Sequence, residues 1–153
     1  MLLKIIKIND KRLRIKNNFI FFFNKIKKIF LIKRILFTMY EKDGVGISAT
    51  QINNNKKIII IDVKKQKPII MINSIILKNN KLYTLSTEGC LSIENFYLNI
   101  ARPEKIIVKF INLFNKIKKK IFNNIISRCI QHENDHLNSI LIIDYNNKII
   151  LYE

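Results

Sequence analysis

The only two histidines of the chain lie one helical turn apart, and this pairing constrains the fold more than any other feature of the sequence. Residues 131–137 read Gln-His-Glu-Asn-Asp-His-Leu and contain the pattern H-E-x-x-H. On an α-helix, His132 and His136 share one face, where two neutral imidazoles can bind one divalent cation. Glu133 then lies where it can accept a proton from a water molecule beside that cation. The pattern therefore predicts a helix that carries a metal site.

The flanking residues favour the same helix. Asn123 or Asn124 can serve as an N-cap, so we predict a helix over about residues 124–137. The histidines would extend its apolar, buried face, whose members follow a 4-3-4 spacing: Ile125, Cys129, His132 and His136. The motif alone leaves one alternative open, which is a pair of inert, hydrogen-bonded histidines at the edge of a core.

A catalytic metal site usually has three protein ligands and one open position, so the two histidines need a third partner. A thermolysin-like peptidase supplies a Glu from a later helix, but Glu153 is the only Glu after His136 and leaves little room for such a helix. Cys90 fits better, because a thiolate is a strong ligand for zinc or ferrous iron. Gly89, just before it, lets the backbone approach a ligand closely. The second cysteine, Cys129, is expected to fill the core.

The remaining patterns predict an α+β fold in one domain spanning residues 1–153, since strands and helices do not alternate as in βαβ units. A helix is predicted over 25–42, ending at the turn signal Asp43-Gly44. Residues 44–51 are expected to form a loop, and the tail from residue 138 an extended piece. Strands are predicted in five runs, the last two joined by a hairpin at Asn115-Lys116: 58–63, 68–72, 75–77, 104–113 and 116–122.

The formal net charge of +17 raises the question of a nucleic-acid partner. The lysines are spread along the whole chain, and the composition is skewed toward Ile, Lys and Asn, with only three Gly, two Pro and no Trp. An A/T-rich coding sequence produces such a composition. We therefore expect no specific nucleic-acid site, and only a weak attraction of the surface to polyanions. With two Cys, no disulfide framework is expected, and a reducing, cytoplasmic compartment is predicted.

Residues 19–37 are strongly apolar, which suggests a membrane segment. Several basic side chains interrupt the run, so no uninterrupted apolar span of about 18 residues exists. We predict an amphipathic helix instead and no membrane partner. Its buried stripe would consist of residues at i, i+3, i+4 and i+7: Ile32, Ile35, Leu36 and Met39. Phe30 and Phe37 lie off that stripe.

Three segments, in this order, resemble the signature motifs of bacterial-type peptide deformylases. They are Gly44–Gln51 (Gly-Val-Gly-Ile-Ser-Ala-Thr-Gln), Glu88–Ser92 (Glu-Gly-Cys-Leu-Ser) and Gln131–Leu137. Weaker similarity extends over nearly the whole chain. The resemblance implies a metal-dependent hydrolase that removes the formyl group from the N-terminal formyl-methionine of new polypeptides. Its expected partners are those nascent chains, with the ribosome surface as a further candidate.

The resemblance also implies a role for each matching residue. The metal ligands would be Cys90, His132 and His136, binding ferrous iron in the cell, with zinc, nickel or cobalt as substitutes. Glu133 would transfer the proton. The oxyanion would be stabilised by two donors, the side-chain amide of Gln51 and the backbone N–H of Leu91.

The substrate chain would pair like an added strand with the Gly-rich segment Gly44, Val45 and Gly46. An ion pair between Glu88 and Arg102 would brace the Cys90 segment.

Four positions depart from the family pattern: Ser48 replaces a usual Ala, Glu94 a Pro, Tyr97 an Arg near the substrate, and Arg128 an aliphatic residue of the methionine pocket. We place Tyr97 and Arg128 among the substrate-binding residues, with the depth of the pocket in question at Arg128. The C-terminal helix of many relatives is also not expected. Two alternatives remain: another H-E-x-x-H metallopeptidase, or a basic binding protein that kept the fold.

Overall fold

The computed structural model describes residues 2–20 and 24–145, so Phe21, Phe22, Phe23 and the tail from 146 lie outside the described residues. The elements within these ranges are the helices α1 (Lys25–Glu41) and α2 (Asn124–Leu137), the 3-10 helices η1 (Lys11–Arg14), η2 (Ala49–Ile52) and η3 (Ile142–Tyr145), and the strands β1 (Gly46–Ser48), β2 (Ile58–Ile61), β3 (Ile69–Asn79), β4 (Tyr83–Cys90), β5 (Ile93–Pro103), β6 (Lys105–Ile111) and β7 (Ile117–Asn123).

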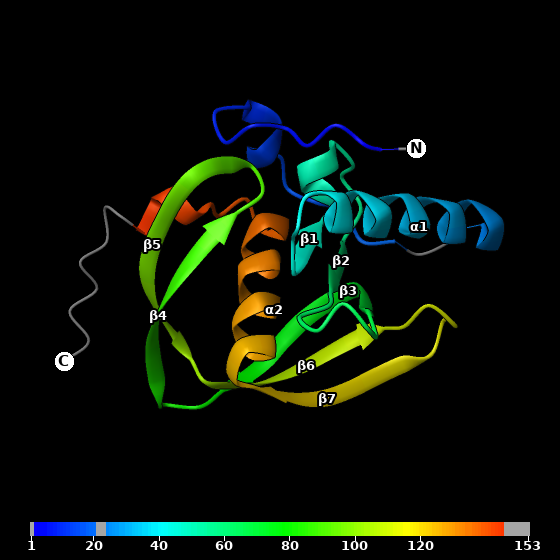
Figure 1. The fold of residues 1–153 in the computed structure, drawn as a ribbon. Coiled ribbons are helices and arrows are strands. Elements are labelled where there is room, and N and C mark those ends of the chain that lie inside the picture. Colours follow the sequence, from blue (N-terminus) through cyan, green and yellow to red (C-terminus); the bar gives the residue numbers. More distant parts are fainter. Residues whose placement is uncertain (1, 21–23, 146–153) are drawn as a thin grey trace.

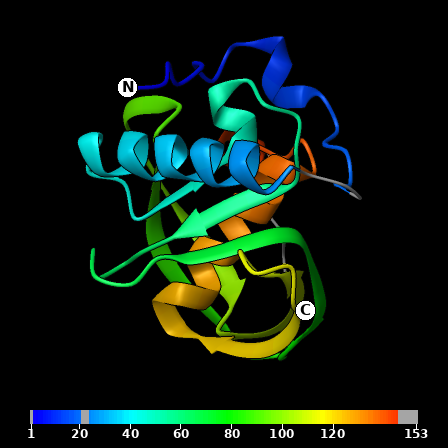
Figure 2. The same ribbon diagram turned by 90° about the vertical axis from the view of Figure 1, so that its right-hand side faces the viewer.

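The strands form two separate antiparallel sheets. The larger sheet has five strands in the order β1-β2-β3-β6-β7, and the smaller one pairs β4 with β5. We call the smaller sheet the β4–β5 ribbon. Helix α2 runs between the ribbon and the larger sheet (Figures 1 and 2). Helix α1 lies beside β1 and β2, at the β1 edge of the larger sheet. This is the α+β class that the sequence predicts.

Strand β2 is four consecutive isoleucines, all fully buried. Such a run is expected for a strand that is covered on both faces. Because side chains alternate along a strand, Ile59 and Ile61 join one apolar cluster with α2, while Ile58 and Ile60 join another with α1. The larger sheet is therefore fixed between two helices by apolar packing.

Helix α1 agrees with its prediction over 25–42. It begins after Asn24, whose side chain accepts hydrogen bonds from two backbone N–H groups of the first turn. Of the predicted stripe, Ile32, Ile35 and Met39 are buried and Leu36 is half-buried, whereas Phe30 and Phe37 are exposed. No helix in the described ranges is both long and apolar enough to cross a bilayer.

Several predicted elements need correction. Part of the expected loop at 44–51 forms β1 and η2, because it pairs with β2. The two short strands expected at 68–72 and 75–77 form one strand, β3, with irregular register against β6. Strands β4 and β5 were not predicted, and the tail after 138 contains η3 rather than only extended chain.

Asparagine adopts the left-handed backbone conformation at several positions, including turns at Asn53 and Asn115. No glycine has a positive φ in the described residues, while five asparagines do: Asn53, Asn73, Asn95, Asn115 and Asn124. Asn tolerates the left-handed region better than most side chains. Asn115 lies at the predicted hairpin between β6 and β7, and Asp43 takes a φ of 52° just after α1. A chain with three glycines can thus still form its turns.

Candidate metal centre

The last strand residue of β4 and two residues of α2 meet at one point. The Sγ of Cys90 lies 3.3 Å from Nε2 of His136. Cys90, His132 and His136 each offer a ligand atom, and these atoms lie within 4.8 Å of one another. Both imidazoles are buried, with their ring centroids 5.2 Å apart. A thiolate and two imidazoles in this arrangement could hold a divalent transition metal.

Glu88 orients one of the histidines. Its Oε2 lies 3.0 Å from Nδ1 of His132, so Nε2 is the ring nitrogen that faces Cys90. Burial alone would raise the pKa of Glu88, but the hydrogen bonds from His132 and Arg102 lower that pKa to about 2. Burial likewise opposes a charge on His132, yet hydrogen bonds with Cys90 and Glu88 raise the pKa of its imidazole to about 10. A carboxylate that fixes a ligating histidine is common beside bound metals.

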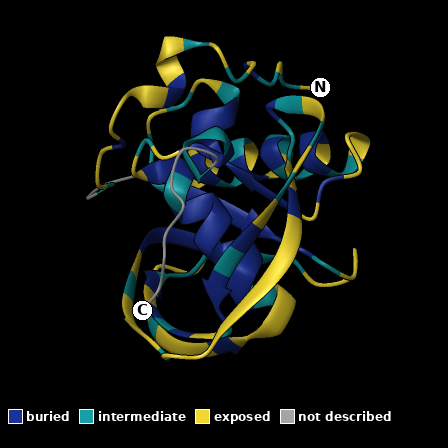
Figure 3. Cartoon of the chain, turned by 90° about the vertical axis from the view of Figure 1, so that its left-hand side faces the viewer, coloured by how far each residue is buried: buried dark blue, intermediate teal, exposed yellow. Residues whose placement is uncertain are grey.

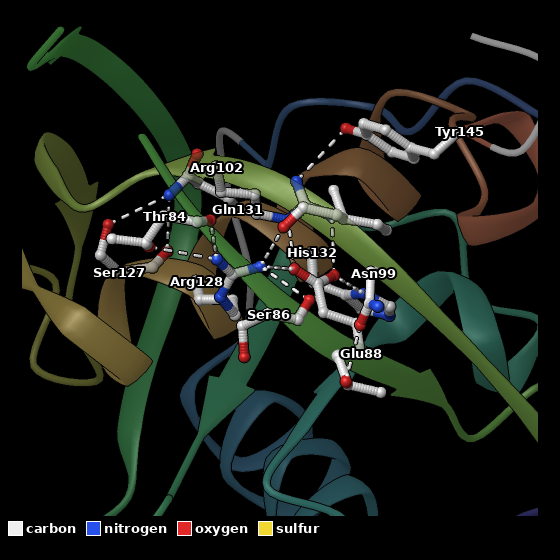
Figure 4. A network of polar contacts seen from close by, with 12 residues as sticks. Thr84, Ser86, Glu88, Asn99, Arg102, Ser127, Arg128, Gln131, His132 and Tyr145 are labelled. Carbon is white, nitrogen blue, oxygen red and sulfur yellow. Dashed lines mark hydrogen bonds and ion pairs between the residues drawn. The ribbon is translucent and has the colours of Figure 1, made fainter. Parts of the chain in front are cut away.

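Two arginines hold Glu88 in place (Figure 4). Arg102 donates through Nε and Nη2 to the two carboxylate oxygens, at 2.6 and 3.0 Å, which is the predicted ion pair. Arg128 donates from Nη1 to Oε1 at 2.7 Å. Arg102 also reaches Asp135 on α2, at 2.8 Å. Glu88 therefore lies at the centre of a buried polar network.

Glu133 differs from Glu88 in having almost no polar contacts. It is buried, and its Oε2 has no hydrogen-bond partner among the described residues. Burial raises the pKa of Glu133 to about 7, against the opposing effect of a charge on His132. A carboxyl group with a pKa near neutrality suits a group that both accepts and donates a proton.

Gln51 points its amide toward Cys90. It is buried rather than a solvated loop residue, and its Oε1 accepts a hydrogen bond from the N–H of Ser48 at 2.9 Å. This contact fixes the amide so that Nε2 lies 3.6 Å from Sγ of Cys90 and 3.3 Å from Oγ of Ser92. The amide donor is thus turned toward the candidate metal centre.

A cavity of about 930 Å³ opens in front of this centre. Its walls include Leu91 and Tyr97 from the ribbon side and Val45 from the start of the larger sheet. The N-terminal segment also contributes, because its backbone is held at Ile6 by Gln51 and at Ile8 by Ser92. The ribbon strand beside the cavity is largely exposed, while α2 behind it is buried (Figure 3).

The structure adds a requirement to the expected role of the glycines. Gly44 and Gly46 are both buried. A Cβ at Gly46 would lie 2.8 Å from Oε1 of Glu133, and one at Gly44 would lie 2.8 Å from Cδ1 of Leu91. Internal space for Glu133 and Leu91 is therefore a further reason for glycine at these positions, besides the expected room for a substrate chain.

The start of α2 differs from expectation at two positions, whereas Cys129 agrees with it. Ile125 is 51% exposed, so the predicted apolar face does not extend to it, although it lines the cavity. The N-cap position is Asn123, but its side chain makes no capping hydrogen bond. Cys129 is buried in the core as predicted, and burial raises the pKa of its thiol to about 12.

The sequence profile of the polypeptide deformylase family matches residues 2–150. The chain belongs to the polypeptide deformylase family. The peptide deformylase of Pseudoalteromonas translucida is 36% identical over 146 residues, which cover 94% of this chain and 86% of that protein. The crystal structure of the peptide deformylase from Thermotoga maritima superposes with a TM-score of 0.89, at 33% identity, and covers 94% of this chain and 97% of its own.

The match to other deformylases is shorter. The peptide deformylase of a Synechocystis strain is 36% identical over 118 residues, and these span 74% of this chain but only 63% of that protein. Family membership and fold are thus established over nearly the whole chain.

The sequence analysis did not identify several polar residues around the candidate metal centre. Asp135 and Tyr145 both contact Arg102, and Gln131 donates to the carbonyl of Pro103 at 2.9 Å. Asp135 and Gln131 lie within the motif of α2, which was a usable signal. Tyr145 belonged only to the weaker family similarity, as part of Asp144-Tyr145, and its contact with Arg102 depends on where η3 brings the chain back.

Proposed function

We propose that this protein is a metal-dependent deformylase that hydrolyses the formyl group from the N-terminal formyl-methionine of newly made polypeptides. The observation that carries this proposal is the convergence of Cys90, His132 and His136, with Glu133 beside them, at the base of a cavity. Membership in the deformylase family supports it.

The donor set fits a divalent transition metal. One thiolate and two imidazoles leave a position open for a reactant, as catalytic sites require. A buried carboxylate oxygen of Glu133 that has no hydrogen-bond partner in the described part of the chain fits the same site, since a buried polar group is normally satisfied. A bound ion would act as a Lewis acid toward the water and the formyl oxygen. We propose ferrous iron in the cell, with zinc, nickel or cobalt as substitutes.

Glu133 is the proposed proton carrier. With a pKa raised to about 7, its carboxylate accepts the proton of the attacking water and returns it to the amine of methionine as the C–N bond breaks. The amide of Gln51 donates to the developing oxyanion without adding a charge. We assign the second donor to the backbone N–H of Leu91, which follows Cys90 directly.

The open edge of β1 is the proposed binding site for the peptide. The carbonyl of Val45 already accepts from the N–H of Asp62. Because hydrogen-bonded and non-bonded pairs alternate in an antiparallel ladder, the N–H and C=O of Gly46 then face away from β2. A substrate chain can pair with these groups as an added strand, which tolerates many sequences.

The methionine side chain would enter between Tyr97, Ile125 and Arg128, which line the cavity. The guanidinium of Arg128 is bound to Glu88 and to backbone carbonyls of the ribbon. Its donors are therefore already engaged within the protein, and an apolar side chain remains a suitable occupant. The proposed site of action is the cytoplasm, on chains emerging at the ribosome.

Formate release tests the proposal directly. The protein is loaded anaerobically with ferrous iron and given a formyl-Met tripeptide, the same peptide without the formyl group, and a longer internal-peptide substrate. We expect formate from the first and no cleavage of the other two. Cleavage of internal bonds without formate would show a peptidase instead.

The Glu133→Gln variant is the matched control for the proton carrier. It is expected to bind the metal as the wild type does and to lose roughly 100- to 10,000-fold in turnover. Retained turnover would remove Glu133 from the mechanism.

A further inference from the structure

We propose that Arg128 is a positioning residue that docks the β4–β5 ribbon onto α2 and thereby keeps Cys90 within reach of the two histidines. The inference rests on the metal site of the proposed function. It concerns how long the metal stays bound, a property that is separate from the hydrolysis itself.

The guanidinium of Arg128 contacts both strands of the ribbon (Figure 4). Its Nη1 donates to Oε1 of Glu88 and to the carbonyl of Ile100, each at 2.7 Å. Its Nη2 donates to the backbone carbonyl of Thr84 and, at 3.2 Å, to the Oγ1 of the same residue. Nη1 also lies 3.4 Å from the carbonyl of Ser86. Arg128 is only 6% exposed, so these contacts are made away from competing water.

Strand β4 of the ribbon needs such a contact because it has little apolar packing of its own. A two-stranded sheet alone is marginally stable. Glu88 is the buried residue of β4, while Leu85 is 69% exposed. The strand that ends at Cys90 is therefore placed by polar contacts more than by a core.

Arg128 joins the ribbon to α2, whereas the ion pair of Arg102 with Glu88 lies within the ribbon. Arg102 belongs to β5 and Glu88 to β4, so their ion pair joins the ribbon to itself. Arg128 belongs to α2, one turn before His132, and its contacts connect the helix of the histidines to the strand of the cysteine. Arg102 adds one such link, through Asp135.

The positive charge of Arg128 weakens metal binding, whereas its hydrogen bonds to the ribbon favour it. A cation near the site repels a divalent ion, and it also makes Glu88 a weaker partner for His132. The planar fork of an arginine can satisfy several carbonyls at once, which a lysine cannot do. A lysine keeps the charge and loses the fork, whereas a methionine loses both, so the two variants separate position from charge.

The test is the rate of zinc release to an excess of a chromogenic chelator. Arg128→Lys and Arg128→Met are compared with wild type and with Arg12→Lys, which alters another arginine–carboxylate pair on the surface. We expect both Arg128 variants to release zinc roughly 10- to 100-fold faster than wild type, as for other groups that orient metal ligands. Arg12→Lys should match wild type.

A core variant, Ile106→Ala, controls for general loss of stability, since Ile106 is fully buried in the larger sheet. It should release zinc at the wild-type rate. The proposal would be overturned if Arg128→Lys released zinc at the wild-type rate, or if Arg128→Met released it more slowly than wild type. It would also be overturned if Ile106→Ala released zinc as fast as the Arg128 variants. Wild type that binds no zinc would contradict the proposed function instead.

Discussion

The larger sheet and the β4–β5 ribbon flank the same helix but are held to it in different ways. The sheet meets α2 through apolar side chains such as Ile59, Val108 and Phe122. The ribbon meets α2 mainly through the network of Glu88 and the two arginines. Apolar packing is non-directional and stabilises the fold, whereas hydrogen bonds and ion pairs fix atoms in place.

The ligands of the candidate metal centre are divided between the same two regions. The histidines lie on the helix that the sheet supports, and the cysteine lies on the ribbon. Disturbing the sheet should therefore lower stability with little effect on the metal, and disturbing the ribbon network should affect both. Variants in the two regions test that separation.

The largest effect on stability is expected from Glu88→Gln. The substitution keeps the shape of the side chain but leaves Arg102 and Arg128 without their shared carboxylate. Breaking a buried ion pair on one side typically costs about 3–5 kcal/mol. Urea unfolding should show a loss of this size, and zinc affinity should fall roughly 10- to 100-fold. An unchanged zinc affinity would show that the ribbon does not depend on this network.

Ile106→Ala tests the sheet. Ile106 is fully buried in the cluster shared with α2, and removing its side chain should lower the free energy of unfolding by about 2–5 kcal/mol. The loss is measured by urea unfolding. Zinc affinity should stay within a few-fold of wild type, and a fall as large as that of Glu88→Gln would remove the distinction between the two regions.

Gly46→Ala tests the contact between the sheet edge and the proposed proton carrier. The new Cβ would lie 2.8 Å from Oε1 of Glu133 and 3.2 Å from Cδ1 of Ile61, so the carboxylate must move. A displacement of about 1 Å can cost roughly 100-fold in rate. We expect a loss of formate release on that scale with the metal content unchanged. Full activity would indicate that the position of Glu133 is not critical.

The smallest effect is expected from Tyr40→Phe, which removes a hydrogen bond of 2.5 Å to Asp62 at the α1 side of the sheet. The free energy of unfolding at pH 7 should fall by about 1–2 kcal/mol. Burial, followed by the hydrogen bond to Asp62, raises the pKa of Tyr40 to about 12, above its usual value near 10.

The raised pKa of Tyr40 determines how its contribution to stability changes at alkaline pH. The unfolded chain loses the phenol proton at a lower pH than the folded protein, so the contribution of Tyr40 is complete below pH 10 and is lost as the pH rises toward 12. The stability difference between wild type and Tyr40→Phe should shrink over this window. A constant difference would contradict the assignment.

The sequence could predict the parts of the site that depend on local spacing. The H-E-x-x-H helix follows from helical geometry, and Cys90 from the need for a third ligand. The ion pair of Glu88 with Arg102 came only from the resemblance to a known family. Buried β2 was also predictable, because its four isoleucines leave no polar face.

The rest depends on contacts between distant segments. The direction of Arg128 is decided by the carbonyls of the ribbon, and β5 was not itself predicted because its exposed and buried positions do not alternate cleanly. The need for Gly46 arises from Glu133, which is 87 residues away in the chain. No local pattern encodes these proximities.

The central claim is that one sulfur and two imidazole nitrogens bind the same ion. X-ray absorption spectroscopy of the zinc-loaded protein measures this directly. We predict one sulfur scatterer at about 2.3 Å and nitrogen scatterers at about 2.0–2.1 Å, with the sulfur contribution lost in Cys90→Ser. A first shell without sulfur in the wild-type protein would contradict the account.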